Sequence, residues 1–65
     1  MSDDHHEIEF LDQLCKRRQA VSVFLLSGIK LEGVIHSFDS GTLVLERDGN
    51  QQLLFRHAIS TIVPS

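Results

Sequence analysis

From residue 20 onward the sequence is divided into short runs of β-branched, aliphatic and aromatic residues, with turn-forming residues between them. The runs are AVSVFLL, IKLEGVIHSF, TLVLER, QQLLFRH and ISTIV, at residues 20–26, 29–38, 42–47, 51–57 and 59–63. Turn signals follow the first three runs, and Asp48-Gly49-Asn50 is a strong hairpin signal. Five short strands at this regular spacing predict a small, strongly bent antiparallel sheet or open barrel.

The first 18 residues have the spacing of a helix instead. Asp4 followed three residues later by Glu7 is a variant of the capping box that begins many helices. Ile8, Leu11, and Leu14 or Cys15 would then share one apolar face. Three cations close this segment, and cations in a last turn suit the negative end of the helix dipole. The sequence therefore predicts a mainly β fold with one N-terminal α-helix.

The second predicted strand alternates in character along its length. Ile29, Leu31 and Ile35 would face one side of the sheet, and the intervening polar residues would face the other. Gly33 lies in the middle of this strand, where a glycine weakens a flat strand but permits a sharp bend. A sharp bend within residues 29–38 is therefore permitted.

The chain is short, with 65 residues and a single cysteine, Cys15. An internal disulfide is excluded, and so is a zinc site built on two cysteines of one chain. Small folds without such cross-links commonly gain stability from partner subunits. A chain of this length also has little to cover the edges of its sheet, and exposed edges are templates for pairing with another copy. The sequence therefore predicts a ring or a dimer formed by strand pairing.

The net charge is −3 with histidines neutral, which alone argues against binding a polyanion. The charge is uneven, however: an acidic N-terminus precedes Lys16-Arg17-Arg18, and Arg56-His57 is a second small basic group. Rotational symmetry in a ring would repeat each cation at one radius. Two basic residues in each chain could then form a circle of positive charge able to hold a phosphate backbone.

Catalysis is not expected from this sequence. Cys15 lies close to the apolar face of the predicted helix, where a buried and inert cysteine is expected. His36 and His57 have no carboxylate partners of evident geometry, and no nucleophile, base and orienting group occur together. We expect no enzyme activity and no cofactor.

Asp3, Asp4, His5 and His6 could bind a divalent ion, but a solvated terminal tail is the expected reading, with no metal. No apolar run approaches a membrane span. The acidic N-terminus is unlike a secretory signal, and one free cysteine suits a reducing cytoplasm.

Two segments, SGIKLEGVIHSFD at residues 27–39 and FRHAISTIVPS at residues 55–65, resemble the Hfq proteins, bacterial RNA chaperones of the Sm-like superfamily. The resemblance implies an acidic tail at residues 1–6 and an Sm-like domain at residues 7–65. It further implies a homohexameric ring in which the fourth and fifth strands of neighbours pair. Such proteins bind RNA and promote annealing of small regulatory RNAs to messenger RNAs.

On the pore face, the resemblance assigns uridine-rich RNA ends to a group comprising Arg56, His57, Ser40 and Gly41. Gly41 stands where the family pattern has a phenylalanine, and stacking of a base on an aromatic ring is worth about 1–3 kcal/mol. Glu7 replaces a glutamine and adds a negative charge. We therefore expect weaker binding of uridine-rich RNA than in typical relatives. Arg56 should compensate in part, because its planar guanidinium can grip a phosphate through two N–H groups and can stack.

On the opposite face, the resemblance assigns adenine-rich RNA to a second group of residues. This opposite-face group comprises Phe24, Gly28, Ile29, Lys30, Leu31, Gln52 and Thr61. For Phe24 and Leu31, simple packing in the core is an equal alternative. Glu32 departs from the family pattern here, replacing a glutamine. At the rim of the ring, Lys16, Arg17 and Arg18 supply three cations for RNA.

Two alternatives to an RNA chaperone remain open from the sequence. One is an Sm-like ring that acts mainly as a protein-interaction scaffold, with RNA affinity reduced by Glu7, Glu32 and Gly41. The other is a monomeric SH3-like adaptor, which a solution mass near 7.3 kDa would favour.

Overall fold

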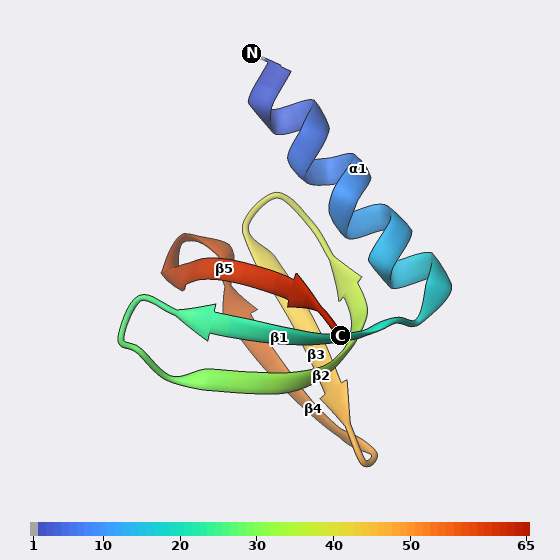
Figure 1. The fold of residues 1–65 in the computed structure, drawn as a ribbon, viewed down its shortest axis with the longest axis vertical. Coiled ribbons are helices and arrows are strands. Elements are labelled where there is room, and N and C mark those ends of the chain that lie inside the picture. The colour runs from blue at the N-terminus through green and yellow to red at the C-terminus, as the bar shows by residue number, and fades with distance from the viewer. Residues whose placement is uncertain (1) are drawn as a thin grey trace.

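The computed structural model describes residues 2–65, with side chains described from Ile8 onward. Figure 1 shows an N-terminal helix followed by five strands, as the sequence predicts. The elements are α1 (Ser2–Arg17), β1 (Ala20–Leu25), β2 (Lys30–Phe38), β3 (Thr42–Arg47), β4 (Asn50–Phe55), η1 (Arg56–Ala58) and β5 (Ile59–Pro64). The candidate metal ligands, Asp3, Asp4, His5 and His6, lie outside the described side chains. The division between residues 1–6 and 7–65 stays a prediction.

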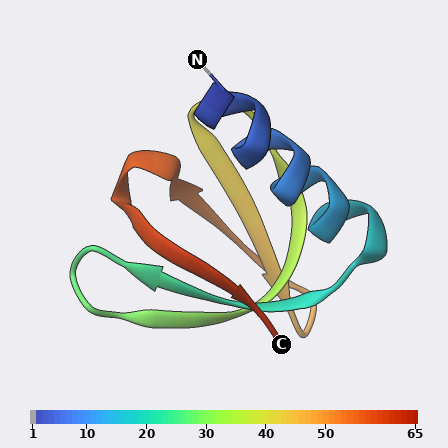
Figure 2. The same cartoon turned by 45° about the horizontal axis from the view of Figure 1, so that its top comes forward.

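The five strands form one antiparallel sheet in the order β4-β3-β2-β1-β5. The sheet is strongly bent but not closed into a barrel, and α1 lies beside it near β2 (Figure 2). β4 and β5 are therefore the two edge strands. Among residues 2–65, each has one side with no neighbouring strand, which agrees with the uncovered edges expected from the sequence.

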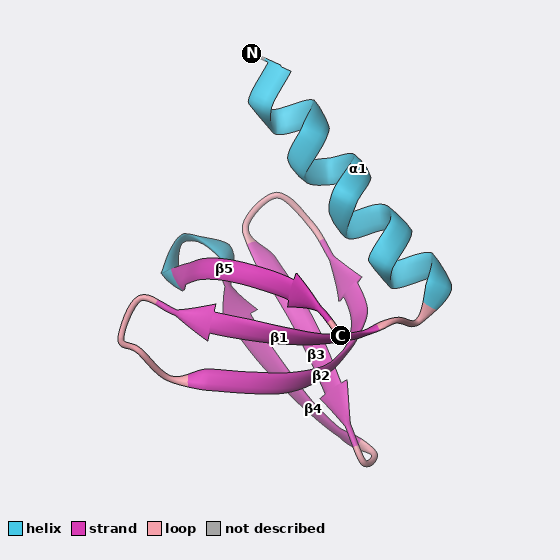
Figure 3. Cartoon of the chain, viewed as in Figure 1, coloured by secondary structure: helices cyan, strands magenta, loops and turns pink. Residues whose placement is uncertain are grey.

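The fourth strand is shorter than predicted. Arg56 and His57 were expected at the end of strand 51–57, but β4 ends at Phe55 and both residues lie in the 3-10 helix η1 (Figure 3). The reason is the order of the strands. β4 and β5 lie at opposite edges of the sheet, so the chain must stop pairing with β3 before it can cross from one edge to the other. The amide of Leu26 donates to the carbonyl of Ala58 at 2.8 Å and fixes this turn against the β1–β2 connection.

The core is formed by seven buried aliphatic side chains. Leu11 and Leu14 come from α1, and the sheet contributes Val21, Val23, Ile35, Leu43 and Leu45. Ile8, which was expected on the same helical face, is 49% exposed because it lies a turn beyond the point where α1 meets the sheet. Cys15 is half-buried, and its thiol donates to the carbonyl of His36 at 3.4 Å.

The bend in β2 has two local causes. A Cβ atom at Gly33 would lie 2.6 Å from the carbonyl oxygen of Glu46, so only glycine lets β3 approach this closely. The pairing with β3 then shifts register between Ile35 and Ser37, which leaves His36 as the extra residue of a β-bulge. The bend that Gly33 permits is therefore continued by a bulge that the sequence alone did not indicate.

The β3–β4 hairpin forms where it was predicted. Arg47 pairs with Asn50, so the loop contains only Asp48 and Gly49, with φ angles of 53° and 83°. Positive φ at both loop residues is the requirement of a type I′ turn, which an Asp-Gly pair favours.

Candidate nucleic-acid interface

The β2–β3 turn is organised by one carboxylate. Oδ1 of Asp39 accepts hydrogen bonds from the amides of Gly41 (2.9 Å) and Thr42 (2.8 Å) and from the Thr42 hydroxyl (2.9 Å). The bond from Gly41, then those from Thr42, and the nearby charge of Arg56 hold the pKa of Asp39 below its ordinary value. Asp39 therefore remains an acceptor at neutral pH and fixes the backbone of this turn.

Arg56 links η1 to the same turn. Its amide donates to the carbonyl of Gly41 at 2.9 Å, and its Nη1 donates to the carbonyl of Asp39 at 2.6 Å. Ser40 lies exposed between these two acceptors. The structure therefore brings Arg56, Ser40 and Gly41, three residues of the predicted pore-face group, together at one end of the sheet. Glu7, which was expected beside them, lies outside the described side chains.

His57 follows Arg56 in η1 and stacks on a neighbouring ring. Its ring centroid lies 5.8 Å from that of Phe55, with 24° between the planes. Phe55 is 55% exposed and pairs across the ladder with Thr42, the residue after Gly41. An aromatic surface thus lies close to Gly41. No other atom lies within 4 Å of the place that a Cβ atom would occupy at Gly41, so the space beside this residue is open.

Sequence reasoning did not select Asp39 or Phe55 as site residues. Asp39 follows Phe38 in a turn signal, so its capping role could have been read from the Asp-x-Gly-Thr spacing. Phe55 gave no such signal, because an aromatic residue at the end of an apolar run is usually assigned to the core.

A groove of about 190 Å³ lies between α1 and the start of β5. It is lined by Phe10, Leu11, Leu43, Arg56, Ile59, Ser60, Thr61 and Ile62. Thr61 was assigned to the opposite-face group but lines this groove together with Arg56. It also pairs with Phe24 across β1 and β5, so it lies between the two predicted sites.

The other residues of the opposite-face group are spread over neighbouring strands. Phe24 pairs with Lys30 across β1 and β2, and the Lys30 ammonium lies 6.0 Å from the centre of the Phe24 ring. Gly28 and Ile29 form the turn between these strands, with φ at 95° for Gly28 and the Ile29 side chain exposed. Phe24 and Leu31 are both half-buried, which leaves their partial role in packing open.

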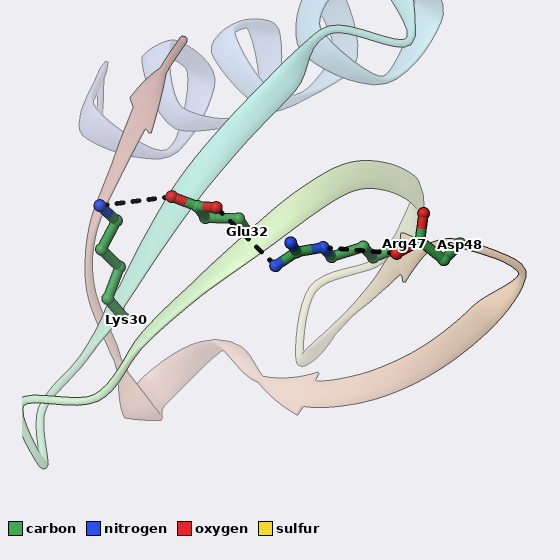
Figure 4. Close-up of polar contacts among 4 residues, drawn as sticks. All are labelled: Lys30, Glu32, Arg47 and Asp48. Carbon is green, nitrogen blue, oxygen red and sulfur yellow. Dashed lines mark ion pairs between the residues drawn. The ribbon is translucent and has the colours of Figure 1, made fainter.

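Lys30, Leu31 and Gln52 line a second cavity, of about 260 Å³, together with Glu32 and Arg47. Figure 4 shows Lys30, Glu32, Arg47 and Asp48 in a row, joined by ion pairs. Glu32 forms two ion pairs: one carboxylate oxygen lies 3.3 Å from the Lys30 ammonium, and the other lies 3.7 Å from the Arg47 guanidinium. Arg47 also lies 3.7 Å from the carboxylate of Asp48. The positive charges of Lys30 and Arg47 are therefore balanced by the negative charges of Glu32 and Asp48 at the edge of this cavity.

The three rim cations differ in their surroundings. Lys16 pairs with Asp12 one helical turn earlier at 3.1 Å, and Arg18 reaches Glu46 on β3 at 3.5 Å. Arg17 ends α1 with its side chain exposed. The predicted basic group is thus at the helix end as expected, although two of its charges have carboxylates nearby.

Within the described residues, no group of three or more histidine, cysteine or acidic side chains is placed to hold a metal ion. Over the same part of the chain, no helix has the length and apolar character needed to cross a membrane.

An N-terminal helix followed by a strongly bent, five-stranded antiparallel sheet is the fold of the Sm-like proteins. A crystal structure of the pleiotropic translational regulator Hfq superimposes with a TM-score of 0.90 at 29% identity, covering 100% of this chain and 98% of that one. The crystal structure of an Hfq protein from Anabaena sp. has the same fold, with a TM-score of 0.84 at 22% identity.

Sequence comparison gives the family directly. The family model of the Hfq protein matches residues 8–65. The RNA-binding protein Hfq of Caldicellulosiruptor bescii is 56% identical over 57 residues, and that of Anoxybacillus flavithermus is 52% identical over 56 residues. Each match covers 86% of this chain, and 62% and 76% of those two proteins respectively. The chain belongs to the Hfq family.

Proposed function

We propose that this chain is an RNA-binding protein that assembles into a homohexameric ring and acts as an RNA chaperone. The observation that carries the proposal is the match to the Hfq family over residues 8–65, combined with two groups of basic and aromatic side chains, Lys30 with Phe24 and His57 with Phe55. In this role the protein holds single-stranded RNAs together, promotes annealing of small regulatory RNAs to messenger RNAs, and catalyses no covalent chemistry.

The edge strands support assembly. Leu53 on β4 and Val63 on β5 are 58% and 45% exposed in the single chain, and Phe55 at the end of β4 is similarly exposed. Apolar side chains on an uncovered strand edge are costly to leave in water and favour pairing with another copy. Pairing of β4 with β5 of a neighbour would cover both edges in the same contact and, repeated, would close a ring.

The proposed ring binds RNA on two faces. On the opposite face, Lys30 provides a cation and Phe24 provides a stacking surface for adenine-rich strands, with Gln52 as a polar contact. On the pore face, Arg56 and His57 hold the phosphates of uridine-rich ends. Gly41 supplies no stacking side chain there, so uridine-rich RNA is the weaker ligand. Arg17, Lys16 and Arg18 contribute at the rim. A single free cysteine suits a cytoplasmic location.

The test is fluorescence anisotropy with labelled oligo-adenylate and oligo-uridylate at low and at high salt. We expect binding of both, tighter for oligo-adenylate, and weaker at high salt because phosphate contacts release counterions. Lys30→Ala should lower only the affinity for oligo-adenylate, and Arg56→Ala only that for oligo-uridylate.

Absence of binding to either RNA at low salt would contradict the proposal and favour a ring that scaffolds other proteins. If both substitutions leave both affinities unchanged, the RNA-binding function stands but the assignment of residues to faces is wrong.

A further inference from the structure

The cavity between the start of β2 and the end of β3 has an unusual set of polar groups. A carboxylate, Glu32, and a guanidinium, Arg47, face the same space, and their nearest atoms are 3.7 Å apart. Lys30 adds an ammonium group, and Gln52 of β4 also lines this space. The space of about 260 Å³ is large enough for one nucleobase with part of its sugar.

An adjacent carboxylate and guanidinium match one base better than the others. Guanine presents two donors, N1–H and the N2 amino group, next to two acceptors, O6 and N7. A carboxylate accepts from two neighbouring N–H groups, and an arginine fork donates to O6 and N7. Adenine offers a single amino group and leaves either the second carboxylate oxygen or the arginine fork without a partner.

We propose that this cavity is a guanine-selective subsite, in which Glu32 accepts from N1–H and N2–H of the base while Arg47 donates to O6 and N7. The inference rests on the proposed RNA-binding function and deepens it, because it assigns a base preference to the opposite face. Lys30 is placed to meet an adjoining phosphate.

The existing ion pairs do not close the subsite to a ligand. Both oxygens of Glu32 are engaged, but the side chains of Lys30, Glu32 and Arg47 are 50%, 49% and 63% exposed. Ion pairs between solvent-exposed side chains are weak, so exchanging one for hydrogen bonds to a base costs little. The pairs hold the carboxylate and the guanidinium side by side, which presents both to the base in advance of binding (Figure 4).

The experiment compares three RNAs on the native chain. They are oligo-adenylate and two versions of it in which every second adenosine is replaced by guanosine or by inosine, which lacks only the N2 amino group. We expect the guanosine RNA to bind about tenfold more tightly than oligo-adenylate, which is the discrimination one bidentate pair commonly supplies. The inosine RNA should fall between them.

Glu32→Gln is the matched variant, because it keeps the shape of the side chain and removes the charge. Releasing Lys30 and Arg47 from the carboxylate should raise affinity for every RNA, so the readout is the ratio between RNAs. We expect the guanosine preference over inosine to disappear in Glu32→Gln. Arg47→Lys keeps the charge but loses the two parallel N–H donors of the guanidinium. It should reduce the preference of the protein for the guanosine and inosine RNAs over oligo-adenylate.

Equal affinities of the native chain for the three RNAs would overturn the guanine subsite while leaving RNA binding intact. A guanosine preference that survives Glu32→Gln unchanged would also overturn it, even if that variant has a lower melting temperature. Failure of all three RNAs to bind would contradict the proposed function itself.

Discussion

At the scale of single residues, Gly33 is the position where the sheet tolerates no side chain. Replacing it with alanine would put a Cβ atom 2.6 Å from the backbone oxygen of Glu46, and backbone has little freedom to move. We expect Gly33→Ala to lower the free energy of unfolding by about 2 kcal/mol, the usual cost of overpacking. Urea unfolding at fixed protein concentration measures this.

Gly41→Ala is the matched control, because nothing lies within 4 Å of an added Cβ there. Its effect should stay within about 0.5 kcal/mol, as for most surface substitutions. Equal destabilisation by the two substitutions would show that the close approach of Glu46 is not what makes alanine unfavourable at position 33.

Asp39 gives the fold a defined response to acid. Its pKa in the folded chain lies below the ordinary 3.8, so the charged carboxylate stabilises the fold fully above that pH. The contribution is lost as pH falls through the folded-state pKa. We expect Asp39→Asn to destabilise the protein most at pH values well above 3.8, with the difference from the native chain shrinking towards acid. Urea unfolding across the acidic range measures this, and a difference that stays constant with pH would contradict it.

At the scale of elements, α1 ends in a motif usually completed by glycine. The amide of Gln19 donates to the carbonyl of Leu14, and that of Arg18 to the carbonyl of Cys15, each at 3.1 Å. This is the Schellman pattern, and Arg18 occupies its left-handed position with φ at 50°. We expect Arg18→Gly to raise the free energy of unfolding by about 0.5 kcal/mol, because relief of backbone strain exceeds the loss of an exposed pair with Glu46.

Arg18→Ala separates the two contributions. Alanine loses the ion pair with Glu46 and keeps the unfavourable backbone conformation, so it should lower the stability by a similar amount. Chemical denaturation of the native chain, Arg18→Gly and Arg18→Ala under one condition measures the three free energies of unfolding and ranks them. Destabilisation by both substitutions would mean that the pair with Glu46 outweighs the backbone strain.

The elements differ in how far the sequence predicted them. The hairpin at Asp48-Gly49 and the helix followed by five strands follow from local signals, because turn residues and apolar spacing act over a few positions. The 3-10 turn at Arg56 and His57 does not, because the apolar run before it continues smoothly. Its cause is the placement of β4 and β5 at opposite edges, which only the sheet order reveals.

At the scale of the whole molecule, we expect the edge strands to govern the proposed assembly. We expect the native chain to have a solution mass that is a multiple of 7.3 kDa. A lysine at an exposed edge position opposes strand pairing. Leu53→Lys together with Val63→Lys should therefore shift the mass towards a single chain, as measured by light scattering.

Leu26→Lys is the control, since Leu26 is 70% exposed but lies in the β1–β2 turn and on no edge strand. It should leave the mass unchanged. A native mass of one chain would contradict the ring, and an equal shift in the control would contradict the role of the edges.

The sequence by itself determined the class of fold and the family. Local spacing specifies a helix and five strands, and two matched segments give the resemblance to Hfq, which the comparisons confirm. Tertiary structure decided which groups meet. Arg56 on η1 and Asp39 before β3 are 17 positions apart yet hydrogen-bonded, and Glu32 and Arg47 come from different strands. These contacts depend on strand order, register and a bulge, and pairing between distant strands leaves no periodic signal in the sequence.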